Sequence, residues 1–294
     1  MKRRLFLFAF STQVSMTLSS LPRGQIKSIQ DPHAYTALPI AAARAVVTKS
    51  RGAVFKDPLA EKLLVGEDHL MTEAKGFAEY MTKRAMMGDT MVQEAHSQGV
   101  RQVVSLGAGM DSRAFRMGLN DTAFFEVDSH ELFESKEPLV ADVPLQCESR
   151  QVVAGWLGKM DLVADLEQAG FDRHKPSVWL MEGLVMYLIR NDLQKVASEI
   201  NELSAPGSSL WHDAFSKTSV DRGMSFHGVP FVGGLNDYDE LWSSNGFDFA
   251  EVLDADGAWI DRSKQTMQID RRYRWTAEQL HGRPALLFVR AWKS

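Results

Sequence analysis

Apolar and polar residues follow different patterns in the first third of the chain and in the remainder. Up to about residue 100 the apolar positions keep helical spacing, and helices are expected over residues 35–47, in a stretch that starts at Asp57, and over residues 77–98. Asp57 followed by Pro58 is typical of a helix start, because the acid can cap the first turn and proline is tolerated there. Gly99 is a suitable residue for the end of the last helix. The chain therefore begins with a helical region.

From Val103 onward, short apolar runs alternate with segments of helical spacing. The runs expected to be strands are residues 103–106, 123–127, 151–154, 178–181, 209–212, 247–253 and 286–292. Asn191 can cap the helix between the fourth and fifth of these strands. Such alternation predicts an α/β fold with a mainly parallel sheet. The Gly- and Ser-containing stretch over residues 216–236 is expected to be a long loop or lid.

The stretch after the first expected strand has the composition of a ligand-binding turn. Gly107 and Gly109 follow the strand directly. Asp111 or Ser112 can cap the helix after them. Strand, glycine turn and helix together place backbone N–H groups beside a nucleotide-like ligand. Asp128 ends the second expected strand, roughly 20 residues past the glycines, where an acid can accept hydrogen bonds from ribose hydroxyls. These positions predict an α/β enzyme with an adenosyl cofactor.

Several motifs are missing, and their absence narrows the function. The third glycine of the dinucleotide fingerprint is replaced by Ser112, and no Tyr-x-x-x-Lys pair occurs, which disfavours NAD and FAD. The sequence contains no P-loop and no G-x-S-x-G elbow. The histidines are not spaced as metal ligands, so no metal is expected.

Length and composition indicate one large globular domain. The chain has 294 residues, of which 45% are hydrophobic and 24% charged, enough for a substantial core. The formal net charge of −5 gives no electrostatic reason to expect nucleic acid as a partner. Cys147 is the only cysteine. It excludes an internal disulfide and a cysteine-built metal site, and it fits a reducing, cytoplasmic compartment.

The N-terminus allows more than one interpretation. Lys2, Arg3 and Arg4 precede LFLFAF, an apolar run of about six residues that is shorter than the usual core of a signal peptide. A flexible extension over residues 1–32, or a true start at Met16, explains it at least as well. No stretch has the apolar length of a membrane span, so no membrane partner is expected. The sequence does not indicate an oligomeric state.

Four motifs, taken in order, resemble the leucine carboxyl methyltransferase family. They are DPLA at residues 57–60, LGAGMDSRAFR at 106–116, FFEVD at 124–128 and MEGLVMYL at 181–188. The resemblance covers roughly residues 33–260 and is greatest to the bacterial branch of S-adenosylmethionine-dependent O-methyltransferases linked to polyketides and other secondary metabolites. It implies a class I methyltransferase (Rossmann-like) fold, a seven-stranded sheet with helices on both faces. A single domain is then expected over residues 33–294, with a helical cap over 33–99 and a Rossmann-like core over 100–294.

The resemblance also implies a set of positions that bind S-adenosylmethionine. The glycine turn would lie against the methionine part and the ribose, and Asp128 would bind the ribose. Arg84 would hold the carboxylate of the cofactor, for which the guanidinium fork is suited. Glu182 would lie near the methionine end. The expected cofactor-binding residues are Arg84, Gly107, Ala108, Gly109, Asp128, Ser129, Gly155, Trp156, Glu182 and Gly183.

Two positions depart from the family pattern. The family has an acidic residue after the third strand that reaches the adenine amino group, and Gly155 stands there in VVAGWLG. Trp156 could stack on adenine instead, or could be a core residue. A basic residue near the N-terminus holds the cofactor in some members, and Arg44 is the nearest candidate. These departures bear on the affinity for the cofactor more than on its identity.

Methyl transfer from a sulfonium needs little chemical assistance, so positioning of the acceptor is expected to supply most of the acceleration. A carboxylate acceptor needs no base, whereas a hydroxyl acceptor benefits from one. His212 and Asp213, at the end of the fifth strand, are the expected candidates for such a base or for acceptor binding, and His227 is a weaker one. Tyr187, in MEGLVMYL, is either a catalytic or a packing residue.

The leading hypothesis is an S-adenosylmethionine-dependent O-methyltransferase that acts on a carboxylate or hydroxyl of a small-molecule, polyketide-like acceptor. The alternatives are methylation of a protein C-terminal carboxylate and a protein that binds the cofactor without turnover. A nicotinamide-dependent oxidoreductase is disfavoured. The lid and the helical cap are expected to build the acceptor pocket.

Overall fold

A seven-stranded sheet forms the centre of the molecule. The computed structural model describes residues 29–64, 67, 69–261, 263 and 266–294. The strand order is β3-β2-β1-β4-β5-β11-β8. These strands are β1 (Gln102–Leu106), β2 (Leu119–Asp128), β3 (Cys147–Ala154), β4 (Val178–Met181), β5 (Ser209–Phe215), β8 (Phe249–Asp254) and β11 (Leu286–Trp292). The expected α/β fold with a seven-stranded sheet is confirmed.

The sheet is parallel except at β11, which runs antiparallel to both β5 and β8. In the middle of the sheet, Val104 of β1 is paired with Phe125 of β2 on one side and with Trp179 of β4 on the other. Every residue of β1, β4 and β5 is buried, as is usual for parallel strands covered on both faces. Because β3, β2, β1, β4 and β5 are parallel, their carboxyl ends meet at one edge, where ligands bind in folds of this type.

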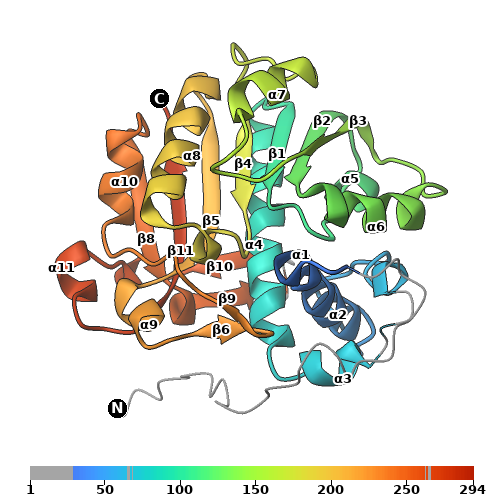
Figure 1. Ribbon diagram of the computed structural model, residues 1–294, viewed down its shortest axis with the longest axis horizontal. Coiled ribbons are helices and arrows are strands. Elements are labelled where there is room, and N and C mark those ends of the chain that lie inside the picture. Colours follow the sequence, from blue (N-terminus) through green and yellow to red (C-terminus); the bar gives the residue numbers. More distant parts are fainter. Residues whose placement is uncertain (1–28, 65–66, 68, 262, 264–265) are drawn as a thin grey trace.

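Helices cover both faces of the sheet (Figure 1). They are α1 (Pro32–Tyr35), α2 (Ala37–Thr48), α3 (Leu70–Ala74), α4 (Ala78–Ser97), α5 (Arg113–Arg116), α6 (His130–Val140), α7 (Leu162–Gln168), α8 (Arg190–Leu203), α9 (Lys217–Asp221), α10 (Tyr238–Ser244) and α11 (Ala277–Leu280), with the 3₁₀ helices η2 (Lys62–Leu64), η3 (Val185–Tyr187), η4 (Ala255–Gly257) and η5 (Arg271–Tyr273). One apolar core joins Val103 to α2, α4, α5 and α6, and the other joins Val104 to α7, α8 and α10. The two valines belong to different cores because successive strand residues point to opposite faces.

The N-terminal helical region agrees with the expectation in outline and differs in detail. α4 matches the last expected helix, and α2 matches the first one except at its start, because Tyr35 ends the separate short helix α1. The stretch after Asp57 forms turns and η2 instead of an α-helix. The carboxylate of Asp57 accepts from the N–H of Leu59 (3.1 Å), as a cap would. It also accepts from Arg44 (2.8 Å) and Ser112 (2.7 Å), so tertiary contacts position this acid.

Later elements also differ from the prediction. Asn191 does not cap α8, because Ile189 is the N-cap and Asn191 lies in the first turn. β2 and β3 extend into polar, exposed residues that an apolar pattern does not mark. The expected lid over residues 216–236 contains α9 and a hairpin of β6 (Ser225–Phe226) and β7 (Val229–Pro230). A second hairpin, of β9 (Ala258–Asp261) and β10 (Thr266–Ile269), was not anticipated.

The expected N-terminal extension falls mainly outside the described residues. Residues 1–28, including the apolar run and Met16, are not among them. Helical structure is present from Pro32 onward, where the carboxylate of Asp31 accepts from the N–H groups of His33 (2.7 Å) and Ala34 (3.0 Å). In the described part of the chain, no helix combines the length and the apolar character that crossing a membrane requires.

Candidate active site

A large cavity lies at the carboxyl ends of the parallel strands. Its volume is about 1200 Å³. It is lined by residues at four strand ends, Gly107 after β1, Asp128 of β2, Glu182 after β4 and Asp213 of β5. Residues of α1, α2 and α4 line it as well, and so do residues around α9 and β6; Figure 1 shows α1, α2, α9 and β6 at the same end of the sheet. The N-terminal helices and the strand ends of the sheet therefore build one site together.

The turn after β1 depends on both of its glycines. Gly107 has a φ of 63° and Gly109 a φ of 49°, a conformation that other residues adopt only with strain. A Cβ at Gly107 would lie 3.0 Å from Cδ1 of Leu184, and one at Gly109 would lie 3.1 Å from Cβ of Ala37. Backbone conformation and close packing thus both require glycine here.

The N–H groups of this turn are engaged mainly within the protein. Ala108 donates to the carbonyl oxygen of Val127 (3.1 Å), and Gly109 donates to Oδ2 of Asp128 (2.7 Å). Oδ1 of Asp128 accepts from the N–H of Ser129 (2.7 Å). Burial raises the pKa of Asp128, and the two N–H donors act in the opposite direction. Asp128 therefore lies beside the glycine turn as expected, but the turn offers a ligand close backbone contact more than free N–H donors.

Arg44 supports the glycine turn from α2. Its Nε lies 2.8 Å from Oδ2 of Asp57, and its Nη2 donates to the carbonyl oxygen of Met110. Ser112 donates through Oγ to the same carboxylate oxygen of Asp57 (2.7 Å). Arg44 lines the cavity, but its charge is compensated by Asp57. Its contacts hold the turn in place, and a direct contact with the cofactor stays a prediction.

Arg84 of α4 is buried, lines the cavity and has one N–H group without a described hydrogen-bond partner. Its Nη1 lies 3.3 Å from Oδ2 of Asp213, and its buried Nε has no hydrogen-bond partner among the described residues. A buried donor left unpaired costs about 1–3 kcal/mol, so a ligand carboxylate at this position would be stabilising. Gly183 (φ 70°) gives Arg84 its space, since a Cβ there would lie 2.7 Å from Nη1. Arg84 and Gly183, both expected to bind the cofactor, therefore lie side by side at the cavity, and their contact with the cofactor stays a prediction.

Asp213 is the centre of a hydrogen-bonded cluster that joins β5 to α4 and to the end of β4. Its carboxylate accepts from the hydroxyl of Tyr80 (2.8 Å) and the N–H of Gly183 (2.6 Å), in addition to Arg84. With three donors on its two oxygens, Asp213 is poorly placed to take a proton from an acceptor. Its contacts are those of a positioning residue. Tyr80 also lines the cavity, and sequence reasoning missed it because an aromatic residue in a helix usually indicates packing.

Glu182 is held by Arg113, a residue of the LGAGMDSRAFR motif to which the sequence analysis assigned no role in the site. Nη2 of Arg113 lies 2.5 Å from Oε1 of Glu182, and the same guanidinium pairs with Asp111 (2.7 Å) and Asp89 (2.8 Å). Burial raises the pKa of Glu182, and Arg113 acts against this shift. No local pattern could have revealed this cluster, because its acids come from α4, from the glycine turn and from the end of β4. Arg113 connects these three elements.

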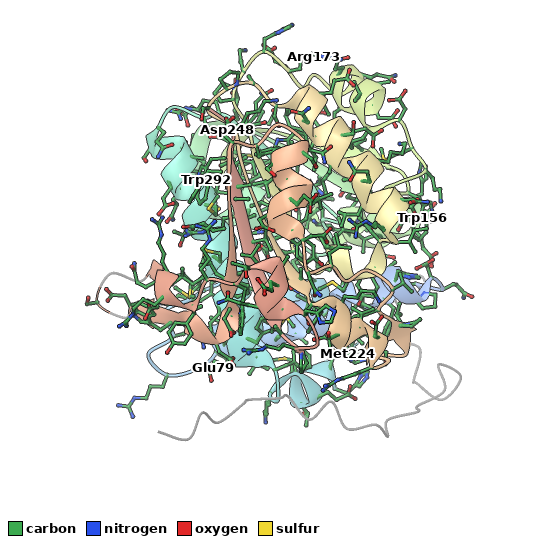
Figure 2. The ribbon with its side chains drawn as sticks, turned by 90° about the vertical axis from the view of Figure 1, so that its left-hand side faces the viewer. Glu79, Trp156, Arg173, Met224, Asp248 and Trp292 are labelled. Atoms are coloured by element: carbon green, nitrogen blue, oxygen red, sulfur yellow. The ribbon has the colours of Figure 1, made fainter. Side chains whose placement is uncertain are left out.

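Trp156 lies at the rim of the cavity. Its side chain is 50% exposed and lines the cavity, and Figure 2 shows it at the periphery of the molecule. The alternative of a core tryptophan is therefore wrong, and stacking on adenine stays a prediction. At the neighbouring Gly155, a Cβ would lie 2.9 Å from Sδ and 3.2 Å from Cβ of Met160, so an acidic side chain there would require Met160 to shift.

The structure does not bring His212 to the cavity. Along β5, Asp213 faces the cavity, whereas His212 faces the opposite core and is fully buried. Its Nε2 accepts from Nε1 of Trp242 (3.0 Å), and its Nδ1 lies 3.2 Å from the carbonyl oxygen of Asp213. Burial lowers the pKa of His212 to about 4. A catalytic role for His212 is thus not supported, because its ring is neutral, engaged and turned away from the cavity.

The two other catalytic candidates differ in position. Tyr187 lines the cavity, with its ring centroid 5.5 Å from that of His33 and 5.4 Å from that of Phe231. Burial raises the pKa of Tyr187, so its phenol stays protonated and can donate a hydrogen bond. His227 lies in the turn between β6 and β7, with its ring 6.5 Å from that of Tyr35, and does not line the cavity. Tyr187 therefore stays a candidate for contact with the acceptor.

The comparison with known proteins agrees with this geometry. Residues 37–201 match the family model described as leucine carboxyl methyltransferase. The chain belongs to the leucine carboxyl methyltransferase family. A relative from Mycolicibacterium vanbaalenii is 30% identical over 277 residues, which covers 81% of this chain and 88% of that protein. A relative from Streptomyces coelicolor is 34% identical over 195 residues, 60% of this chain and 64% of its own length. Both are named as candidate S-adenosyl-L-methionine-dependent methyltransferases. S-adenosyl-L-methionine is also the cofactor that the sequence indicated.

Solved structures resemble this member of the leucine carboxyl methyltransferase family in fold. A candidate methyltransferase from Thermobifida fusca has a TM-score of 0.51 and 16% identity, covering 91% of this chain and all of its own. A DUF574 family protein from Streptomyces avermitilis has a TM-score of 0.51 and 15% identity, covering 86% of this chain and 97% of its own. At these identities the likeness concerns the fold alone. The expected class I methyltransferase fold is confirmed, and family membership confirms the expectation of a methyltransferase.

Proposed function

We propose that this protein uses S-adenosyl-L-methionine to methylate an oxygen atom of a small-molecule acceptor. The observation that carries the proposal is the cavity beside the glycine turn and Asp128. At about 1200 Å³ it exceeds the ~300–1000 Å³ of an ordinary small-molecule site, so a cofactor and an acceptor fit together. The proposed acceptor group is a carboxylate or hydroxyl, for example of a polyketide-like compound, and a cytoplasmic location belongs to the same proposal.

The residues around the cavity fit this cofactor. The glycine turn permits close approach of a ligand, Asp128 adjoins it, and Arg84 has an unpartnered buried Nε. We assign the ribose to Asp128 and Ser129, the methionine part to Gly107, Ala108, Gly109, Glu182 and Gly183, its carboxylate to Arg84, and the adenine to Gly155 and Trp156. When bound, S-adenosyl-L-methionine supplies a methyl group that its sulfonium has already activated.

The protein's own contribution is to bind and orient the acceptor. Tyr187 lines the cavity as a protonated phenol and is proposed to donate a hydrogen bond to the acceptor. Asp213 holds Arg84 and Tyr80 in position. Because His212 is turned away and the oxygens of Asp213 are engaged, a carboxylate acceptor, which needs no base, is favoured over a hydroxyl.

Calorimetric titration tests cofactor binding. The wild-type protein is expected to bind S-adenosylhomocysteine, and more weakly S-adenosyl-L-methionine. Asp128→Ala removes a charged hydrogen-bonding partner worth ~1.5–3 kcal/mol, so the affinity should fall at least about tenfold. Asp142→Ala, at an exposed position outside the cavity, is the matched control and should bind normally. Absence of binding to the wild-type protein would contradict the proposal.

Transfer is tested with methyl-labelled cofactor and a panel of aromatic acids, phenols and peptides. Label in a product that mild base hydrolyses identifies a methyl ester and hence a carboxylate acceptor, whereas a base-stable product identifies a methyl ether. Label on a peptide C-terminus would favour the protein carboxyl methyltransferase alternative. Binding without transfer to any acceptor would favour a protein that has lost turnover.

A further inference from the structure

Beyond the positions assigned to the cofactor, the cavity continues into an aromatic chamber. We use this name for the part lined by Phe77, Met81, Phe215, Met224, Phe226 and Phe231. These side chains come from α4 and the turn before it, from β5 and from the segment around β6 and β7. In Figure 2, Trp156 lies at one margin and Met224 at the end of the molecule below it, although both line the same cavity. The chamber therefore extends well away from the adenine end.

The walls of the aromatic chamber are held by contacts among its own rings. Phe215 and Phe231 are stacked with centroids 5.1 Å apart, and Phe77 meets Phe226 edge to face at 5.6 Å. Such pairs add about 0.5–1.5 kcal/mol each beyond burial, so these walls are well ordered. A preformed apolar chamber favours a ligand body that is itself apolar or aromatic.

The opening of the chamber is rich in arginine. Arg222, Arg272, Arg274 and Arg283 line the cavity and are exposed, so they lie where it meets solvent. Arg222 follows α9, and Arg283 lies beside the start of that helix, since Ser216 Oγ donates to the carbonyl oxygen of Arg283 (2.8 Å). Arg272 pairs with Asp270. In contrast, no described carboxylate lies within ion-pair distance of Arg222 or Arg283.

Two acidic residues lie near this opening as well, and neither forms an ion pair with Arg222 or Arg283 in the part of the chain that the structure describes. Asp254 and Asp256 also line the cavity. The carboxylate of Asp254 accepts from the N–H of Asp256 (2.9 Å), and Asp256 interacts with Lys83. The opening therefore keeps two guanidinium groups that have no ion-pair partner among the described residues, and one of them, that of Arg283, lies over the ring of Trp275 (5.7 Å to its centroid).

We propose that the acceptor is an apolar or aromatic molecule with an anionic group at the end remote from the methylated oxygen, and that Arg222 and Arg283 bind this group. The proposal rests on the proposed function for the identity of the ligand as an acceptor. The aromatic chamber holds the apolar body, and the arginines select its orientation, so that the other end faces the cofactor. Guanidinium groups suit carboxylate, sulfate and phosphate alike, so the shared feature is a planar or tetrahedral oxyanion.

Two fluorescent probes of matched shape test this inference. Anilinonaphthalene sulfonate carries an apolar body and an anionic group, and phenylnaphthylamine has a similar body without the charge. Each is titrated into the full-length protein with S-adenosylhomocysteine present. The variants are the double substitution Arg222→Gln/Arg283→Gln, the chamber substitution Phe226→Ala, and Arg51→Gln, an exposed arginine outside the cavity, as control. Circular dichroism and the affinity for S-adenosylhomocysteine check that each variant is folded.

The double arginine variant is expected to bind the sulfonate probe about fivefold more weakly, because two exposed ion pairs are lost, and to bind the neutral probe as the wild type does. Phe226→Ala should weaken both probes, and Arg51→Gln neither. Unchanged binding of the sulfonate probe to the double variant, or an equal loss of both probes, would overturn the inference. Failure of the wild-type protein to bind S-adenosylhomocysteine would instead contradict the proposed function. The comparison of the two probes would still show whether Arg222 and Arg283 bind an anionic group.

Discussion

Replacement of Gly88 by alanine tests whether α4 is shaped around the Glu182–Arg113 pair. Gly88 lies within α4, where alanine ordinarily stabilises a helix by about 1 kcal/mol relative to glycine. Here, however, a Cβ would lie 2.0 Å from Oε1 of Glu182 and 2.4 Å from Nη2 of Arg113. Both atoms would have to move by about 1 Å or more to reach ordinary contact distance, which would disrupt their 2.5 Å ion pair.

The expected change in the free energy of unfolding combines two destabilising contributions and one stabilising contribution. Overpacking of a buried site costs about 1–3 kcal/mol. Loss of one partner of a buried ion pair costs about 3–5 kcal/mol, but Arg113 would keep Asp89 and Asp111, so only a minor part of that cost applies. After subtraction of the helix gain, Gly88→Ala is expected to lower the free energy of unfolding by about 2 kcal/mol, and Tm by several degrees. Binding of S-adenosylhomocysteine should weaken as well, because Glu182 loses its orientation.

Urea unfolding followed by circular dichroism, together with calorimetric titration, measures both effects. Gly76→Ala is the matched control, since the nearest atom to its Cβ would be the carbonyl oxygen of Glu73 at 3.9 Å, and it should not destabilise the protein. In a Glu182→Ala background the cost of Gly88→Ala should shrink, because one of the two clashing side chains is gone. A more stable Gly88→Ala variant, or the same cost in both backgrounds, would refute this reasoning.

Three further predictions concern single side chains. Burial lowers the pKa of His212 to about 4 from the 6.5 of an ordinary histidine, so its contribution to stability is complete above about pH 6.5 and is lost as the pH falls towards 4. The free energy of unfolding should therefore fall by about 2–3 kcal/mol more in the wild type than in His212→Gln between about pH 7.5 and about pH 4.5. Equal losses in urea titrations of the two proteins would show that His212 is not held neutral. Burial raises the pKa of Cys147 to about 11, so iodoacetamide at about pH 8 should label the native protein far more slowly than the urea-unfolded chain; similar rates would contradict this. Trp156→Ala should weaken S-adenosylhomocysteine binding about tenfold with little change in Tm. Trp259→Ala is the control, because the Trp259 side chain is also half-exposed but lies outside the cavity, and this variant should bind normally. Unchanged affinity in Trp156→Ala would exclude Trp156 from the adenine site.

The sequence by itself determined those features that depend on neighbours along the chain. The long helix α4 and the buried strands β1, β4 and β11 could be predicted, because each carries a continuous apolar pattern of its own period. The glycine turn and Asp128 could be predicted too, since tight turns restrict residue type and the second strand places its last residue next to the first. Motifs with fixed local geometry also supplied the resemblance that the family comparison confirmed.

Only the tertiary structure decided which side chains meet. Arg113 pairs with acids from three separate elements. Asp57, which was predicted to start a helix, instead accepts hydrogen bonds from Arg44 and Ser112 and so stabilises the glycine turn. His212 and Asp213 are adjacent in the sequence, but strand alternation sends one into the core and the other into the cavity. Which of them faces the cavity depends on which helices cover each face of the sheet. Such contacts join residues far apart along the chain, and a local pattern of hydrophobic and polar residues does not predict which distant residues will be in contact.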